Sequence, residues 1–572
     1  MTWEIQWRNT HDANEAADDA ESPFTSTGQV ARAARQIAAD AGIARALSGP
    51  ADTSASNELV TIQTRADDLA RLALRLIGEQ NAHFTDLFAE QAGDDGGLTL
   101  RAVLALPQAH DWRWVMLLAP LDAERLAYPA LTPELPVADW YEREIRDEAG
   151  VTPTGHPALA RLRLPASWPR EVFPLLNQLP AAESVPVATS EVSALADDER
   201  PDLEATPEGV VEYPLGPVRS GVVESGHYSL RTVGEEIIDF RLQLFYKHRG
   251  VEQRAVGLTH VHLPLLAERI SGTSGFAHAL ATCETMERIA DISAPPRAQY
   301  LRVLFAELER LYNHLGYHAD LCQATGLAVG QAQLDIQKER VLRLNALLTG
   351  HRYLFGACVF GGVAYDPPEE RLHEARALVN AIRTRTRRLR RFLLDSPSHV
   401  DRLEGTGILT PEDALALGMV GPNARASGVD RDVRRDHPYA AYGDLAFDVP
   451  VQQAGDALAR ARVRLDEIAE SLRLLEQVLA HLATDAARGP VRAVSTEPLL
   501  RVAALGWVES PRGEASHWLR FDDAGRVARY RVRPASFANA QAFPLCVPGR
   551  NILTDFPVIE QSWGLSFAGV DR

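Results

Sequence analysis

Leucine spacing predicts two long helices in the second half of the chain. In residues 293–321, "SAPPRAQYLRVLFAELERLYNHLGYHADL", leucines at positions 301, 304, 308, 311 and 315 form one stripe at the helical period. Pro295 and Pro296 fit the first turn of that helix. In the second segment, apolar residues recur at helical spacing at positions 458, 465, 468, 472, 475, 479 and 482. A core helix of a bundle is the favoured interpretation, and coiled-coil pairing is the alternative.

The first third of the chain has a mixed pattern. A helical stretch, "ADDLARLALRLIGEQ", stands near strand-like runs, "LTLRAVLAL" and "WRWVMLLAP". We therefore expect an α+β protein whose small N-terminal α+β domain is followed by a mainly helical domain with short peripheral sheets. The expected parts are a disordered N-terminus at 1–25, the small domain at 26–182, an acidic linker at 183–207 and the helical domain at 208–572.

Composition excludes several classes of protein. The 572 residues carry 59 Lys and Arg against 77 Asp and Glu, a net charge of −18, which argues against a nucleic-acid binder. The N-terminus is polar and acidic, unlike a signal peptide, and no run of about 18 apolar residues appears, so a cytoplasmic chain is expected. No zinc or iron–sulfur spacing is found among the cysteines, which are Cys283, Cys322, Cys358 and Cys546.

The segment "ERISGTSGFAHALATCETMER" raises a question about metal binding. Ser271 and Ser274 have the spacing of a metal-binding C-x-x-C pair, with a hydroxyl in place of each thiolate. Serine is a preferred N-cap, so one interpretation is the start of the helix that "FAHALATCETMER" predicts. A hydroxyl is also a poor ligand for soft transition metals.

Two further segments are candidates for chemistry or binding. In "YKHRGVEQ", His248 next to Gly250, with Glu252 four residues after the histidine, fits a proton relay, and a solvated turn is the alternative. The run "RTRTRRLRR", residues 383–391, fits a solvated helical face or a contact with an acidic partner or anionic lipid.

Several ordered motifs carry a family resemblance. They are "YKHRGVE", "ERISGTSGFAHALA", "PPRAQYLRVLFAELERLYNHL", "ASGVDRDVRRDHPYAAY", "FDVP" and "RPASFANAQAFP". From about residue 212 onward, the chain resembles the large subunits shared by respiratory complex I (49-kDa type) and membrane-bound, energy-converting nickel–iron hydrogenases. Residues 138–165, "ADWYEREIRDEAGVTPTGHPALARLRLP", resemble the signature of the 30-kDa subunit of complex I. The resemblance implies a fused 30-kDa and 49-kDa chain.

The resemblance also assigns residues to a site. The four hydrogenase positions that hold nickel and iron correspond to Ser271, Ser274, Ser566 and Gly569, so no nickel–iron centre is expected in this chain. The quinone-binding histidine and its aspartate partner in complex I correspond to His248 and Asp320, and the quinone-binding tyrosine corresponds to Gly272. Glu252 matches a hydrogenase glutamate linked to proton transfer. Lys247 and Arg249 are expected to stabilise a reduced acceptor.

The expected function follows from that assignment. The chain is predicted to be a subunit of a membrane-bound oxidoreductase complex, peripheral on the inner face of the cell membrane, that couples electron transfer to proton or sodium movement. His248, Asp320 and Glu252 are the expected proton-transfer residues, and quinone is one expected acceptor. The implied partners are a small subunit with a 4Fe–4S cluster and antiporter-like membrane subunits. A non-catalytic scaffold or coupling subunit is the alternative.

Overall fold

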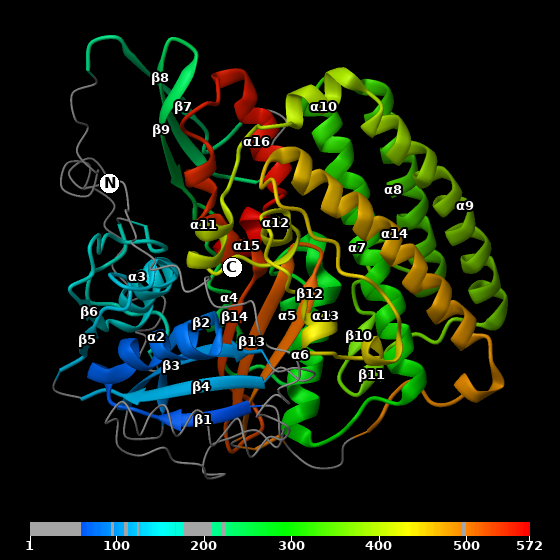
Figure 1. Ribbon diagram of the computed structural model, residues 1–572. Helices are drawn as coiled ribbons and strands as arrows, with labels where there is room; N and C mark the ends of the chain where they lie inside the picture. Colours follow the sequence, from blue (N-terminus) through cyan, green and yellow to red (C-terminus); the bar gives the residue numbers. More distant parts are fainter. Residues whose placement is uncertain are drawn as a thin grey trace, which may run out of the picture.

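The computed structural model describes residues 59–92, 97–107, 113–122, 125–165, 167–176, 207–219, 224–494, 499–500 and 502–572. The predicted disordered N-terminus, 1–25, and residues 183–206 of the predicted linker lie outside these ranges. The predicted α+β class is confirmed: a β-rich N-terminal region precedes a helical region with small sheets (Figure 1).

The N-terminal region is built on a four-stranded sheet in the order β1-β4-β3-β2. β1 (Leu59–Gln63) runs parallel to β4 (Arg113–Pro120), and β3 (Gly97–Leu106) is antiparallel to both β4 and β2 (His83–Ala92). The remaining elements are α2 (Leu69–Gln80), β5 (Ala127–Pro129), α3 (Asp139–Ala149) and β6 (Thr152–Thr154).

Both faces of this sheet are covered, which explains the nearly continuous apolar run of β3. One face contributes Val103, Trp114 and Met116 to the core of the large region. Alternate residues on the other face, such as Leu104 and Leu117, join the core that includes α2.

The large region begins with a second small sheet and a series of short helices. The strands β7 (Val210–Leu215), β8 (His227–Val233) and β9 (Glu236–Gln243) form an antiparallel sheet. The helices that follow are α4 (Val251–Ala255), α5 (Leu263–Ala267) and α6 (Gly275–Ala290).

Four long helices form the bundle at the right of Figure 1. The two predicted helices are confirmed as α7 (Pro296–Ala324) and α14 (Ala457–Leu482), and they pack with α8 (Ala328–Thr349) and α9 (Glu369–Leu394). The arginine run 383–391 lies on α9, where Arg383 pairs with Glu476 and Arg390 with Asp466, so part of it packs against α14. The connecting elements are β10 (Cys358–Val359), β11 (Gly362–Val363), α10 (Pro397–Leu403), α11 (Pro411–Ala416), α12 (Gly421–Ala426) and α13 (Val433–Asp436).

The C-terminal part returns to the middle of the molecule. An antiparallel sheet of β12 (Ala503–Ser510), β13 (Gly513–Phe521) and β14 (Val527–Arg533), drawn in orange, packs beside the blue N-terminal sheet in Figure 1. Then come α15 (Ala535–Ala540), α16 (Phe556–Trp563) and α17 (Phe567–Asp571). The C-terminus therefore lies between the N-terminal region and the helical bundle (Figure 1).

Aromatic and charged contacts join the N-terminal region to the C-terminal sheet. The rings of Trp114 and Trp507 are 5.2 Å apart, and the indole N–H of Trp518 donates to Glu90 at 3.0 Å. These groups are buried, and the three tryptophans belong to the core of the large region, so the interface between the two regions is continuous with that core. Among the residues that the structure describes, no helix is both long and apolar enough to span a lipid bilayer.

Candidate functional site

Three of the four positions that the resemblance assigns to metal ligands are in contact through two hydroxyl groups and one backbone N–H group. The Ser271 and Ser566 oxygens are 2.9 Å apart, and Ser566 Oγ is 3.0 Å from a carboxylate oxygen of Glu224. A carboxylate accepts, so Ser566 donates to Glu224 and Ser271 donates to Ser566. The backbone N–H of Gly569 donates to Ser566 Oγ at 3.3 Å. Residues nearly 300 positions apart in the sequence are thus in direct contact.

The fourth position, Ser274, is held by an arginine. Arg512 donates to Ser274 Oγ at 3.2 Å, to the Asn313 side chain at 3.2 Å and to the carbonyl oxygen of Gly564 at 2.8 Å. Arg512 therefore links the Ser274 turn to α7 and to the C-terminal segment.

Neither Ser271 nor Ser274 caps a helix with its side chain. Ser274 does occupy the N-cap position of α6, as predicted, but its hydroxyl accepts from Arg512 and forms no cap hydrogen bond. Instead, a carboxylate from α7 serves this helix end: Glu309 accepts from the backbone N–H groups of Phe276 and Ala277 at 2.8 and 3.0 Å. The predicted capping role of the Ser271 and Ser274 hydroxyls is therefore wrong, because other groups satisfy both the hydroxyls and the N–H groups.

The side chains at these four positions do not suit a nickel–iron centre. They offer three hydroxyl oxygens and a glycine, whereas such a centre needs soft thiolate ligands. Two of the hydroxyls already hydrogen-bond to each other across the positions that the thiolates would occupy. The four cysteines are buried elsewhere and lie outside this group of contacts.

The turn that carries His248 is fixed by Asp571 near the C-terminus. The Asp571 carboxylate accepts from the backbone N–H groups of Phe245 at 2.8 Å and Lys247 at 2.9 Å. Phe245 has a φ of +68°, a left-handed conformation that is costly for a non-glycine residue and needs such support. The Asp571 carbonyl oxygen lies 2.7 Å from Nδ1 of His248.

That last contact sets the tautomer of His248. A carbonyl oxygen can only accept, so Nδ1 carries the hydrogen and Nε2 keeps its lone pair. Nε2 lies 3.9 Å from Oε1 of Glu148, a residue of α3 in the N-terminal region. Burial lowers the pKa of His248 to about 3, and the charge of Arg163 contributes in the same direction. The imidazole is therefore neutral near pH 7.

Arg249 holds together the three segments of the site. Its guanidinium donates to the carbonyl oxygens of Arg269, Ile270 and Ala568 at 2.7, 2.8 and 2.6 Å. These three bonds connect the His248 turn, the start of the Ser271 turn and α17. The predicted stabilisation of a reduced acceptor by Arg249 stays a prediction, and the observed contacts give it a positioning role.

Glu252 belongs to a buried cluster of carboxylates and guanidinium groups. Side-chain oxygens of Glu144, Glu148 and Glu252 lie within 4.8 Å of one another. Glu252 pairs with Arg529 at 2.8 Å and with Arg572 at 3.0 Å. The guanidinium groups that pair with the three carboxylates are those of Arg163, Arg529, Arg531 and Arg572.

The three carboxyl groups differ in pKa. Burial alone would raise the pKa of Glu144 and Glu252, but the adjacent arginines outweigh burial and hold both below the ordinary value. Burial raises the pKa of Glu148 to about 7; Arg163 opposes this shift, and the negative charges of Glu144 and Glu252 add to it. Of the three, only Glu148 exchanges a proton near neutral pH.

Asp320 lies apart from His248. Its side chain is exposed, and it interacts electrostatically with Lys338, Asp335 and Arg512. Within the described part of the chain, no hydrogen bond or ion pair joins it to His248, whose Nδ1 is occupied by the Asp571 carbonyl. The direct histidine–aspartate bond that the resemblance implied is therefore absent. Asp320 lies instead on the Arg512 side of the site.

The remaining predicted residues lie at the surface of the site. Lys247 is exposed and its backbone N–H donates to Asp571. Gly272 is exposed too, and a Cβ placed on it would meet no atom within 4 Å. Position 272 therefore borders open space.

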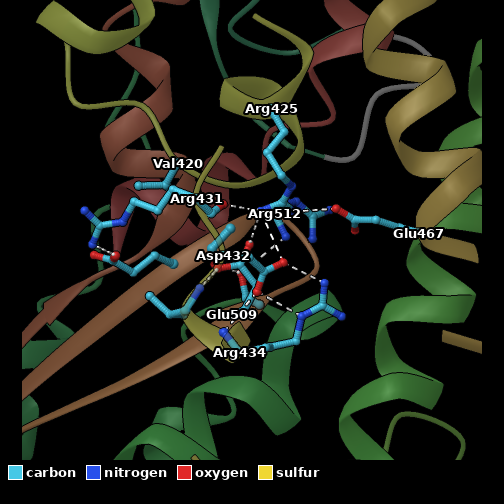
Figure 2. A network of polar contacts seen from close by, with 12 residues as sticks. Val420, Arg425, Arg431, Asp432, Arg434, Glu467, Glu509 and Arg512 are labelled. Atoms are coloured by element: carbon cyan, nitrogen blue, oxygen red, sulfur yellow. Dashed lines mark hydrogen bonds and ion pairs between the residues drawn. The ribbon is translucent and has the colours of Figure 1, made fainter. Parts of the chain in front are cut away.

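A second buried charge network positions Arg512, and Figure 2 shows it from close by. Arg425 lies 3.0 Å from Glu509 and 3.3 Å from Asp432, and Arg434 pairs with Asp432 at 2.7 Å. Asp432 and Arg434 belong to the motif "ASGVDRDVRRDHPYAAY", and Arg425 immediately precedes it. They hold it to β12, whose following turn carries Arg512.

Sequence reasoning missed several residues of the site. Glu224 and Arg512 have no local signal, because each acts through a partner distant in the sequence. The segment 138–165, which resembles the 30-kDa subunit, contains Glu144, Glu148 and Arg163. The resemblance drew attention to the segment but assigned these three residues no role.

Two families of known proteins match this chain. The family described as "Respiratory-chain NADH dehydrogenase, 30 Kd subunit" matches residues 62–185. The family described as "Respiratory-chain NADH dehydrogenase, 49 Kd subunit" matches residues 331–502 and 500–572.

Individual relatives cover most of the chain. Formate hydrogenlyase subunit 5 of Escherichia coli is 34% identical over 466 residues, which are 80% of this chain and 79% of that protein. An NADH-quinone oxidoreductase subunit of Gluconacetobacter diazotrophicus is 28% identical over 79% of this chain and 80% of its own length. A solved chain of the archaeal membrane-bound sulfane sulfur reductase, described as a respiratory membrane complex, has a TM-score of 0.60 at 26% identity, covering 64% of this chain and 99% of that chain. The chain belongs to the family of fused 30-kDa and 49-kDa complex I subunits, which is related to the large subunits of formate hydrogenlyase and hydrogenase-4.

Proposed function

We propose that this chain is a subunit of a membrane-bound respiratory oxidoreductase complex, and that its hydrogenase-like site works without nickel and iron. In that complex it couples electron transfer to an acceptor with proton or sodium movement. The observation that carries the proposal is the contact of Ser271, Ser566 and Gly569 next to the His248 turn. The ligand positions remain together, their side chains are unsuited to nickel, and titratable groups stand beside them.

The proposed partners are those that the family resemblance implies. A small subunit with a 4Fe–4S cluster would supply electrons, and antiporter-like membrane subunits would carry the ion. The complex would place this chain on the inner face of the cell membrane, without a cofactor bound by the chain itself. Support comes from the solved relative, which is described as part of an archaeal respiratory membrane complex.

Two acceptor classes are candidates. Quinone is the acceptor named for the NADH-quinone oxidoreductase relatives. A sulfane sulfur compound is the second candidate, because the structural relative is described as a sulfane sulfur reductase. Gly272 favours the second candidate, since this position lacks the phenol that the complex I resemblance assigns to quinone binding.

The test is purification of the native complex through an affinity tag on this chain. Elemental analysis should find iron without stoichiometric nickel, and the complex should reduce a quinone or a polysulfide but take up no hydrogen. Glu252→Gln and His248→Ala should lower turnover while leaving assembly intact, with the exposed Glu134→Gln as control. Stoichiometric nickel or hydrogen uptake would refute the metal-free site. Full turnover in both variants would favour a non-catalytic scaffold.

A further inference from the structure

Hydrogen bonding leaves one oxygen of the buried carboxylate cluster unexplained. Oε1 of Glu148 accepts from Arg163, but Oε2 is buried and has no hydrogen-bond partner among the described residues. The Glu148 side chain is only 5% exposed. An unpaired oxygen of a buried, ionised carboxylate is costly, whereas a neutral carboxylic acid carries no charge to desolvate. Oε2 is therefore the oxygen of this carboxyl group that is free to carry a proton.

We propose that Glu148, supplied by the N-terminal region, holds the proton that His248 delivers to the acceptor. This inference rests on the proposed function and extends the site into the 30-kDa-like part of the chain. The Oε1 atom lies 3.9 Å from Nε2 of His248, the nitrogen that has the free lone pair. The terminal torsion of a carboxyl group is roughly two-fold, so rotation can bring the protonated oxygen to the place of Oε1, and a movement of about 1 Å then puts it within hydrogen-bond distance of Nε2.

Burial supports a neutral acid beside a neutral imidazole. Burial raises the pKa of Glu148 to about 7, and burial lowers the pKa of His248 to about 3. At neutral pH, a proton shared between these two groups therefore rests on the carboxyl. The charged and titratable groups that face the pair are Glu144 from α3, Arg163 after β6, Glu252 from α4, Arg531 from β14, and Asp571 and Arg572 at the end of the chain.

The proposed step is a proton transfer without electron movement within the pair. The O–H bond of the Glu148 carboxyl breaks and an N–H bond forms at Nε2, leaving a carboxylate and an imidazolium. Arg163 stabilises the carboxylate that forms. The imidazolium is a strong acid because its pKa is low, so it readily gives the proton to a reduced, negatively charged acceptor. Solvent then returns a proton to Glu148.

A cation site is a poorer interpretation of the same carboxylates. Four guanidinium groups already pair with Glu144, Glu148 and Glu252. A divalent ion placed among them would face more positive than negative charge. The cluster is therefore arranged to accept or release a proton.

The first test is infrared spectroscopy of the purified full-length chain across the pH range. The wild type should lose the C=O band of a protonated carboxylic acid as pH rises through about 7. Glu148→Gln should lack that component, while Glu134→Gln, an exposed control in the same region, should retain it. Other buried carboxyls with a raised pKa remain in both spectra and cancel in the difference. A Glu148→Gln spectrum with the full band would overturn the proposal.

The second test is the pH profile of turnover in the purified complex. Wild-type turnover should fall as pH rises through about 7, when Glu148 loses its proton. Glu148→Gln should reduce turnover by roughly 10²-fold and abolish that limb. Glu148→Asp should restore a titrating limb, which a merely structural role would not do. If His248→Ala is impaired while Glu148→Gln keeps the wild-type profile, this inference is wrong and the proposed function stands. If both variants keep full turnover, the proposed function fails as well.

Discussion

Glu148→Gln should change how the stability of the chain depends on pH. Its carboxyl has a pKa raised from 4.5 to about 7 because the folded chain buries it. Between these two values the folded state binds more protons than the unfolded state, so this group's stabilising contribution is present below about pH 4.5 and is lost as pH rises through about 7. One pH unit corresponds to about 1.4 kcal/mol, so the loss across the window is about 3 kcal/mol.

The measurement is the free energy of unfolding by denaturant at several pH values, for wild type and variant. The wild type should lose about 3 kcal/mol more than Glu148→Gln between about pH 4.5 and about pH 7. Glu144 and Glu252 stay ionised through this window because arginines hold their pKa values low, so they add little to the difference. The control is Glu134→Gln, whose curve should run parallel to the wild type. Parallel curves for wild type and Glu148→Gln would refute the reasoning, because Glu148 would then ionise alike in both states.

Three further predictions follow from the contacts of the site. Gly569→Ala should cost less than about 1 kcal/mol of stability, because a Cβ there meets its nearest atoms at 3.6–3.7 Å. Gly506→Ala should destabilise the chain strongly, because its Cβ would lie 1.9 Å from a threonine oxygen. Thermal unfolding of the two variants measures the difference. Arg249→Met should lose about 2–4 kcal/mol with its three bonds to carbonyl oxygens, and hydrogen exchange should accelerate in 566–572 but be unchanged in α14. Ser271→Ala should cost about 1 kcal/mol by removing its bond to Ser566, and a cost above about 3 kcal/mol would contradict the hydroxyl chain.

The sequence predicted the helices and strands in which buried positions recur at a regular spacing. Leucine spacing predicted α7 and α14, and the strand-like runs predicted β3 and β4, because one face of each helix and alternating faces of each strand must be apolar. The linear motif around His248 likewise indicated a turn with a nearby carboxylate. Both kinds of signal are local.

The charged partners of the site could not be predicted in this way. By composition, "DWYEREIRDEA" is typical of a solvated helix, yet Glu142, Glu144, Asp147 and Glu148 are all buried in α3. A buried carboxylate is tolerated only when its partner is present, and here the partners come from the segment after β6, from β14 and from the end of the chain. Pairings across such sequence distances leave no periodic trace. The expected bond between His248 and Asp320 was wrong for the same reason, because the backbone carbonyl of Asp571 accepts the hydrogen bond from His248 instead.

The arrangement also explains how the site keeps its shape with side chains unsuited to a metal. In a metal centre, coordination bonds hold the ligand segments together, and removing the metal usually loosens them. Here protein groups form those links: Arg249 bridges the Ile270 and Ala568 backbones, and Arg512 bridges Ser274 and Gly564. Both arginines are themselves positioned by the fold, so the contact of the ligand positions does not depend on an ion. Hydrogen bonds of the protein alone thus hold Ser271, Ser274, Ser566 and Gly569 in place, and Gly272 beside them borders open space.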